Sequence, residues 1–89
     1  MEFHIIESNE FVSELEKFIL TDKIRIERFI VQLKQNAHLV GQPLSFPFLR
    51  EKKFNGKRLY YLIYMEWSAA LLVTFSDKKT QSTTILFIK

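Results

Sequence analysis

The chain has 89 residues, of which 47% are hydrophobic and 15% aromatic, so we expect one hydrophobic core and a single domain over residues 1–89. It contains no cysteine, which excludes disulfides and thiolate metal sites and fits the reducing cytoplasm. Residues 1–10 are acidic where a signal peptide would be basic, and no apolar run approaches the roughly 20 residues of a membrane span. Secretion and membrane insertion are therefore not expected.

The net charge of +3 hides a marked asymmetry along the chain. Residues 1–22 hold six acids and one base, a net charge of −5, whereas the remainder holds twelve bases and four acids, a net charge of +8. Such a separation favours one surface that binds an anionic ligand and another that is electrostatically distinct from it. From charge alone, that ligand is a nucleic acid, an acidic protein or a membrane headgroup layer.

The first 40 residues predict a short strand followed by two helices. Residues 2–7 read as a strand that ends at the turn-prone pair Ser8-Asn9, and either residue is a suitable N-cap. Apolar residues then recur at helical spacing from Glu10 to residue 19. Thr21 and Asp22 resemble a second N-cap, which opens a longer amphipathic helix that ends near residues 36–38.

After residue 43 the pattern changes to alternating aromatic and β-branched residues, which is typical of strands. Residues 46–54 lead into Asn55-Gly56, a strong signal for a two-residue type I′ hairpin turn, and residues 57–66 form the returning arm. The apolar run 69–76 predicts a central strand. The expected fold class is therefore α+β, in the order β-α-α-β-β-β, with an antiparallel sheet packed on an N-terminal helical hairpin.

The tail after residue 77 fits either a strand or a short C-terminal helix, and the i,i+3 spacing of Ile85 and Ile88 favours the helix. Its start, Lys78-Lys79, should emerge near the Asn55-Gly56 turn in an antiparallel meander. Three basic groups would then share one end of the sheet; they are Arg50, Lys52 and Lys53, then Lys57 and Arg58, then Lys78 and Lys79.

Strand alternation assigns residues 57–66 to two faces. Arg58, Tyr60, Leu62 and Tyr64 share one face, and the intervening residues share the other. If the intervening residues pack on the helices, Arg58 and Tyr60 point to solvent, where arginine binds phosphate and tyrosine stacks on bases of single-stranded RNA. The alternative is that these cations serve solubility and the tyrosine rings belong to the core.

The stretch GQPLSFPFLREKKFNGKRLYYLIY, followed by LLVTFSDKKTQSTTILFIK, resembles the RelE/ParE superfamily of bacterial and archaeal toxins. The shared features are two N-terminal helices, a hairpin ending in a G-x-R motif here formed by Gly56 and Arg58, and a basic pair after the last long strand. The resemblance covers nearly the whole chain in element order. It implies an mRNA interferase of a type II toxin-antitoxin system, with a cognate antitoxin, the ribosome and mRNA as partners.

The implied reaction is cleavage of mRNA by its own 2′-hydroxyl, without metal or other cofactor, so that the protein supplies a base, a proton donor and cations for the phosphate. By position in the family, the expected catalytic residues are Arg58, Lys78, Lys79 and Lys52. The expected RNA-binding residues are Arg50, Lys53, Lys57, Tyr60 and Gln81. A one-residue shift of register would exchange the faces that the lysines of residues 50–53 occupy.

The chain departs from the family at its C-terminal end. RelE-type members often carry a tyrosine in that segment, and residues 83–85 contain none. Two alternatives stay open for this reason: a ParE-like inhibitor of DNA gyrase, and an inactive RelE-like binding module. The two imidazoles, His4 and His38, are more consistent with structural roles than with catalysis.

Overall fold

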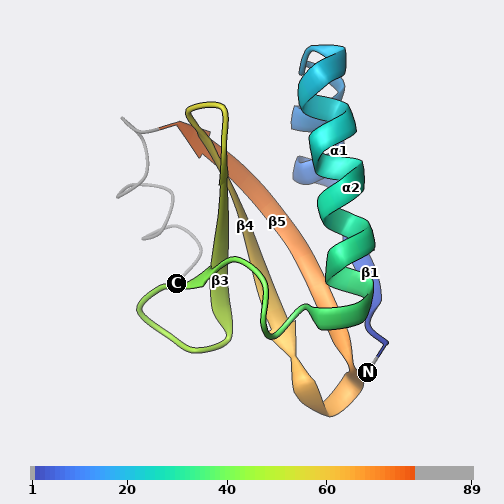
Figure 1. The fold of residues 1–89 in the computed structure, drawn as a ribbon, viewed down its shortest axis with the longest axis vertical. Coiled ribbons are helices and arrows are strands. Elements are labelled where there is room, and N and C mark those ends of the chain that lie inside the picture. The colour runs from blue at the N-terminus through green and yellow to red at the C-terminus, as the bar shows by residue number, and fades with distance from the viewer. Residues whose placement is uncertain (1, 78–89) are drawn as a thin grey trace.

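A computed structural model describes residues 2–77 of the chain. The elements are β1 (His4–Glu7), α1 (Asn9–Glu16), α2 (Leu20–Asn36), β2 (Gln42–Pro43), β3 (Leu49–Phe54), β4 (Lys57–Tyr64), the 3-10 turn η1 (Met65–Trp67) and β5 (Ala69–Asp77). Figure 1 shows α2 running alongside the long strands, with the β3–β4 turn and the junction of the two helices at the same end of the molecule. The predicted α+β class is confirmed, with the two-residue strand β2 as an addition.

The five strands form one sheet in the order β1-β5-β4-β3-β2. Strands β3, β4 and β5 are antiparallel, as predicted, but β1 pairs with β5 in parallel. The expected antiparallel sheet is therefore confirmed for β3, β4 and β5, and the expectation was wrong for β1. The two helices between β1 and the later strands supply the long connection that a parallel pair needs, whereas a tight turn would have imposed antiparallel pairing.

Both helices begin close to the predicted positions. The cap of α1 is one of those predicted, and the cap of α2 is not. The Ser8 hydroxyl accepts a hydrogen bond from the amide of Phe11 and caps α1, as the sequence indicated. Helix α2 starts earlier than predicted, at Leu20. Its N-cap position is occupied by Ile19, which makes no side-chain capping hydrogen bond. Thr21 and Asp22 thus lie within its first turn. Asp22 does not cap the helix but bonds to the β3–β4 hairpin.

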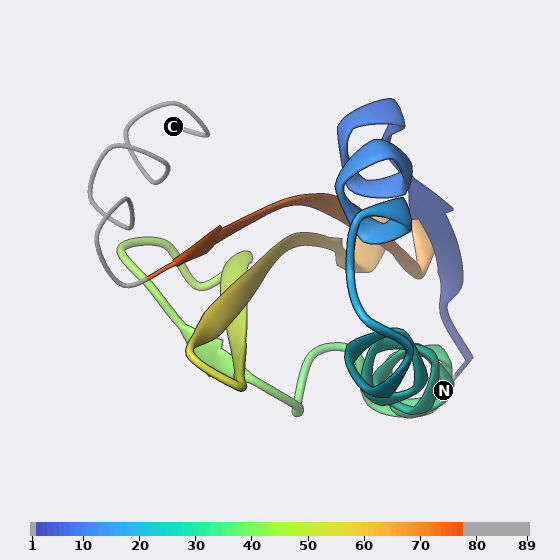
Figure 2. The ribbon, with the colours of Figure 1, turned by 90° about the horizontal axis from the view of Figure 1, so that it is seen from above.

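The core lies between the helices and one face of the sheet, here called the helix face. From the sheet it takes Leu59, Tyr61 and Ile63 of β4, which alternate with residues of the opposite face, here called the outer face. Helix α2 contributes Phe29, whose ring packs edge-on against Tyr61 at a centroid separation of 5.7 Å. Figure 2 shows α2 end-on beside the curved sheet. This packing fixes which side chains of the hairpin each face presents.

The β3–β4 turn has the predicted type I′ character, with φ of 44° at Asn55 and 74° at Gly56. Its first arm is shorter than predicted, since β3 begins at residue 49 and not at 46. Pro47 has no N–H to donate to a strand ladder, and the flanking Phe46 and Phe48 stack on each other outside the sheet at 5.1 Å. Residues 78–89, with the predicted C-terminal helix or strand, lie outside the described residues.

Candidate nucleic-acid interface

Arg58 and Lys53 are cross-strand neighbours at the turn end of the hairpin. Antiparallel partners point to the same face, so both belong to the outer face, away from the helices. Lys53 is exposed, and the two residues line a pocket of about 310 Å³ that also includes Asn55, Gly56 and Lys57. The hairpin therefore presents a cationic concavity at its turn end, lined by Lys53 and Arg58 of the outer face and by Phe54 and Lys57 of the helix face.

The Arg58 guanidinium is held by a carboxylate of the same hairpin. Its Nη1 donates to both oxygens of Glu51, at 3.0 and 3.1 Å. The side chains of Arg58 and Glu51 are 17% and 4% exposed, so water screens this pair weakly. Within residues 2–77 these bonds use only Nη1. The carboxylate therefore fixes the orientation of the guanidinium and offsets part of its charge, while Nε and Nη2 keep their donors for another acceptor.

Tyr60 is not available for stacking on a base. The ring is completely buried, and the hydroxyl is 2.7 Å from the Ser76 hydroxyl on β5. Burial raises the pKa of Tyr60 above its usual value of 10.0, so that the phenol stays protonated at neutral pH. The prediction of a solvent-facing Tyr60 was wrong, because the outer face is covered at this position although it does not pack on the helices.

Arg50 points to the helix face and serves the fold. Its Nε donates to the carbonyl of Val40 at 2.9 Å, and its Nη2 donates to the carbonyl of Gly41 at 3.2 Å. The hydroxyl of Tyr61 donates to the same Val40 carbonyl at 2.5 Å. Two side chains of the hairpin thus satisfy the backbone that follows α2. The predicted RNA-binding role of Arg50 conflicts with this use of its donors.

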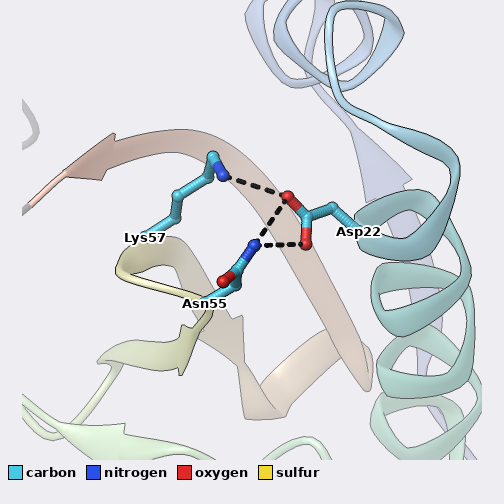
Figure 3. A network of polar contacts seen from close by, with 3 residues as sticks. All are labelled: Asp22, Asn55 and Lys57. Carbon is cyan, nitrogen blue, oxygen red and sulfur yellow. Dashed lines mark hydrogen bonds and ion pairs between the residues drawn. The ribbon is translucent and has the colours of Figure 1, made fainter.

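Lys57 is likewise committed to a structural contact. Its ammonium group lies 3.0 Å from the buried carboxylate of Asp22, which also accepts hydrogen bonds from the Asn55 amide at 3.1 and 3.4 Å (Figure 3). The hydrogen bond from Lys57, with a smaller contribution from Asn55, lowers the pKa of Asp22 below its usual 3.8 against the opposing effect of burial. This network ties the first turn of α2 to the hairpin turn.

Lys52 lies on the helix face, on the other side of the sheet from Arg58. Its ammonium is 5.5 Å from the centroid of the Phe29 ring. Lys52 also lines a pocket of about 190 Å³, here called the α2–β3 pocket, together with Arg25, Arg28, Gln32 and the rings of Phe29 and Phe54. The two arginines were not among the predicted site residues. Their i,i+3 spacing, which brings them to one side of α2, was the signal available.

The predicted site residues therefore separate into groups. Lys53 and Arg58 meet on the outer face, Lys52 faces α2, and Arg50 and Lys57 hold structural contacts. Lys78, Lys79 and Gln81 lie outside the described residues. Within residues 2–77 no three side chains of the metal-binding types form a group, and no helix in that range is long and apolar enough to cross a membrane.

The spatial arrangement is similar to that of several solved structures. A mutant E. coli toxin RelE in the free state superimposes with a TM-score of 0.79 at 14% identity, with all of both chains covered. The chain has the RelE fold. The same mutant RelE in complex with an antitoxin RelBc peptide gives a TM-score of 0.76 at 14% identity, covering 94% of this chain and 95% of that one.

The toxin-antitoxin complex RelBE2 from Mycobacterium tuberculosis gives a TM-score of 0.74 at 16% identity, covering 88% of this chain and 100% of that one. No protein-family model matches the sequence, and no curated protein matches it. At this level of identity the similarity shows the RelE fold alone. The roles of the site residues depend on their own contacts.

Proposed function

We propose that this chain is the toxin of a type II toxin-antitoxin system, a cytoplasmic endoribonuclease that cleaves mRNA on the ribosome and is neutralised by a cognate antitoxin. The observation that carries the proposal is the cationic concavity at Lys53 and Arg58 on a chain with the RelE fold. Neighbours of that fold include RelE toxins, and three of these structures are complexes with an antitoxin chain or peptide. The charge asymmetry of the sequence supports a polyanionic substrate.

The chemistry needs no metal in this proposal. The 2′-oxygen of one ribose attacks the adjacent phosphorus, the bond from phosphorus to the 5′-oxygen breaks, and the products are a 2′,3′-cyclic phosphate and a 5′-hydroxyl. The 2′-hydroxyl loses a proton to a base, and the leaving 5′-oxygen gains one from an acid. Arg58, with Lys53 beside it, stabilises the negative charge that develops on the phosphoryl oxygens. Lys78 and Lys79, from outside the described residues, are our candidates for the proton transfers.

Glu51 gives this arrangement its geometry. A guanidinium presents five N–H donors in one plane, so Arg58 can keep Nη1 on Glu51 while Nε and Nη2 bind a phosphate in the two-point manner typical of arginine. The carboxylate lowers the net charge of the concavity, and in exchange it holds the guanidinium plane in one orientation before RNA binds. Glu51 is thus a positioning residue in the proposed site.

The test is brief induction of the full chain in a bacterial host, with the 5′ ends of cellular mRNA mapped before growth stops. We expect growth arrest and new 5′ ends within translated reading frames. An inhibitor that blocks the ribosomal A site, added after induction, should abolish the new 5′ ends. Arg58→Ala should reduce cutting about 100-fold or more, the usual cost of losing one donor to a developing oxyanion. Lys34→Ala, at an exposed position of α2, is the matched loss of one cation and should cut like the wild type.

Folding of the variants is checked by soluble yield and circular dichroism, and Arg58→Lys separates geometry from charge. Lysine keeps the charge and lacks the planar fork, so we expect it to restore less than a tenth of the lost cutting. Cutting by Arg58→Ala at the wild-type rate, or high soluble expression of the wild type with normal growth and intact mRNA, would refute the ribonuclease.

A second candidate is a RelE-fold module that binds without cutting. The bond between Glu51 and Arg58 favours it, because the carboxylate occupies part of the arginine that the reaction uses. The same induction experiment separates the two, since a binding module associates with ribosomes and leaves mRNA intact. A ParE-like gyrase inhibitor would instead induce the DNA-damage response.

A further inference from the structure

The turn end of β3, residues 52–54, forms an open edge of the sheet. Strand β2 pairs only with Arg50 and Glu51, so within residues 2–77 no strand borders the outer side of residues 52–54. Three pockets surround this edge and share its side chains. They are the α2–β3 pocket, a pocket of about 250 Å³ that includes Gln42, Lys52 and Lys53, and the cationic concavity at Lys53 and Arg58.

Five cations surround the edge and form a series from the helix face to the outer face. Arg25 and Arg28 lie on α2, Lys52 projects between them and the edge, Lys53 projects from the next residue to the other face, and Arg58 is its cross-strand partner. Neither Arg25 nor Arg28 forms an ion pair with an acid among residues 2–77, although the charge of Arg25 helps to lower the pKa of Asp22. Glu51 lines the middle pocket, with its carboxylate held by Arg58.

We propose that the backbone of one single-stranded RNA follows these five cations across the open edge of β3, with phosphates bound in the α2–β3 pocket as well as beside Arg58. This inference rests on the proposed function, since it takes RNA as the substrate. It adds a second binding site, on the opposite side of the sheet from the reacting phosphate, that fixes the position of the strand. In this arrangement Lys52 binds backbone and does not take part in the proton transfers.

The chemistry of the α2–β3 pocket favours a phosphate backbone over an acidic amphipathic peptide. A helix docking in a groove inserts apolar anchors into exposed apolar surface. Here the Phe29 ring is only 3% exposed and lies beneath the Lys52 ammonium, so this ring offers no open surface to an apolar anchor. Phosphates repeat at every nucleotide, which suits cations distributed along a path.

The test measures binding of the purified full chain to a fluorescent oligouridylate of about 12 nucleotides, within the range that single-strand grooves hold, as a function of salt. The association constant K falls as salt rises, so the slope of log K against log salt is negative. We expect Arg25→Gln/Arg28→Gln to make this slope shallower by about 1.4, about 0.7 for each of two lost phosphate contacts on a single strand. The matched control is Lys17→Gln/Lys34→Gln, which removes the same formal charge at exposed positions that line none of the three pockets and should keep the wild-type slope.

A tetranucleotide supplies the second readout. It is too short to span both faces, so the difference in slope between wild type and Arg25→Gln/Arg28→Gln should shrink to less than half of that seen with the longer strand. Equal slopes for wild type and this variant on the 12-nucleotide strand would overturn the proposed path. Undetectable RNA binding by the wild type would overturn it too. Binding of poly-glutamate with the same arginine dependence, and not of RNA, would assign the pocket to a protein partner.

Failure of the proposed path and failure of the proposed ribonuclease give different results. Mapped mRNA cleavage that depends on Arg58 with no change of slope on removing Arg25 and Arg28 would reject only the path across β3. The altered slope together with intact mRNA in induced cells would reject the nuclease and leave an RNA-binding surface.

Discussion

The two faces of the β3–β4 hairpin use the same residue types for different purposes. On the helix face, Arg50 and Lys57 bind groups outside the hairpin, the carbonyls after α2 and the carboxylate of Asp22. On the outer face, Arg58 binds Glu51 within the hairpin, and the Tyr60 hydroxyl hydrogen-bonds to Ser76 of the adjacent strand β5. Cations on the helix face thus join the layers of the fold. On the outer face, Arg58 is instead held within the hairpin by Glu51, and its Nε and Nη2 donors remain for a ligand.

The largest expected effect contrasts the two glycines with positive φ, Gly41 at 70° and Gly56 at 74°. A Cβ at Gly41 would meet the Tyr61 hydroxyl and lie 2.6 Å from the Glu51 carbonyl oxygen, whereas one at Gly56 has nothing within 4 Å. Gly41→Ala combines backbone strain with overpacking and should lower the free energy of unfolding by about 3 kcal/mol. Gly56→Ala has the strain alone and should lose about 1 kcal/mol.

Urea denaturation of the two variants measures this difference directly. Equal losses would show that the segment following α2 can move away from the sheet, and the distinction between an anchored helix face and an independent outer face would then fail at its first point.

An intermediate effect is expected from removing one cation on each face. Arg50→Met deletes two charge-assisted hydrogen bonds to backbone carbonyls and should lower the free energy of unfolding by about 2 kcal/mol. Lys53→Met deletes an exposed outer-face cation and should change it by less than about 0.5 kcal/mol while weakening RNA binding. The same urea titrations test this pair. A stability loss at Lys53 as large as that at Arg50 would contradict the assignment of roles to the faces.

The sequence was sufficient where the determining interactions are local. Asn55-Gly56 tolerates the positive φ of a type I′ turn without reference to the rest of the chain, and the apolar stripe of α2 repeats at helical spacing over its whole length. Both were predicted. The parallel pairing of β1 was not, because a strand of four residues contains no information on the direction of its distant partner β5.

The site was harder to predict for the same reason. Alternation correctly separated Arg58 from its neighbours, yet it cannot say how far a face is covered, and Tyr60 proved to be buried. The roles of Arg50 and Lys57 depend on groups 9 to 35 residues away in the sequence. The sequence alone does not show whether a basic side chain pairs with a group of the same protein or is available to a ligand.

The smallest and most specific effect concerns pH at the Asp22 network. Because the folded pKa of Asp22 is lowered below 3.8, its ionised form stabilises the fold at pH values above about 3.8, and that contribution is lost as the pH falls through the lower, folded pKa. Asp22→Asn should therefore be less stable than the wild type at pH 6. The difference should narrow steadily below about pH 3.8, as the wild-type carboxylate itself becomes neutral.

Lys57→Met provides the matched background, since the hydrogen bond from Lys57 is the main cause of the lowered pKa. In that background the pH-dependent part of the Asp22→Asn effect should fall by more than half, with the rest owed to Asn55 and more distant charge. Urea titrations of the four proteins at pH 6 and pH 3 complete the cycle. A stability difference between wild type and Asp22→Asn that is the same at both pH values would mean that the carboxylate acts through shape and not charge. The Asp22 network would then add no ionic contribution to the attachment of α2 to the hairpin.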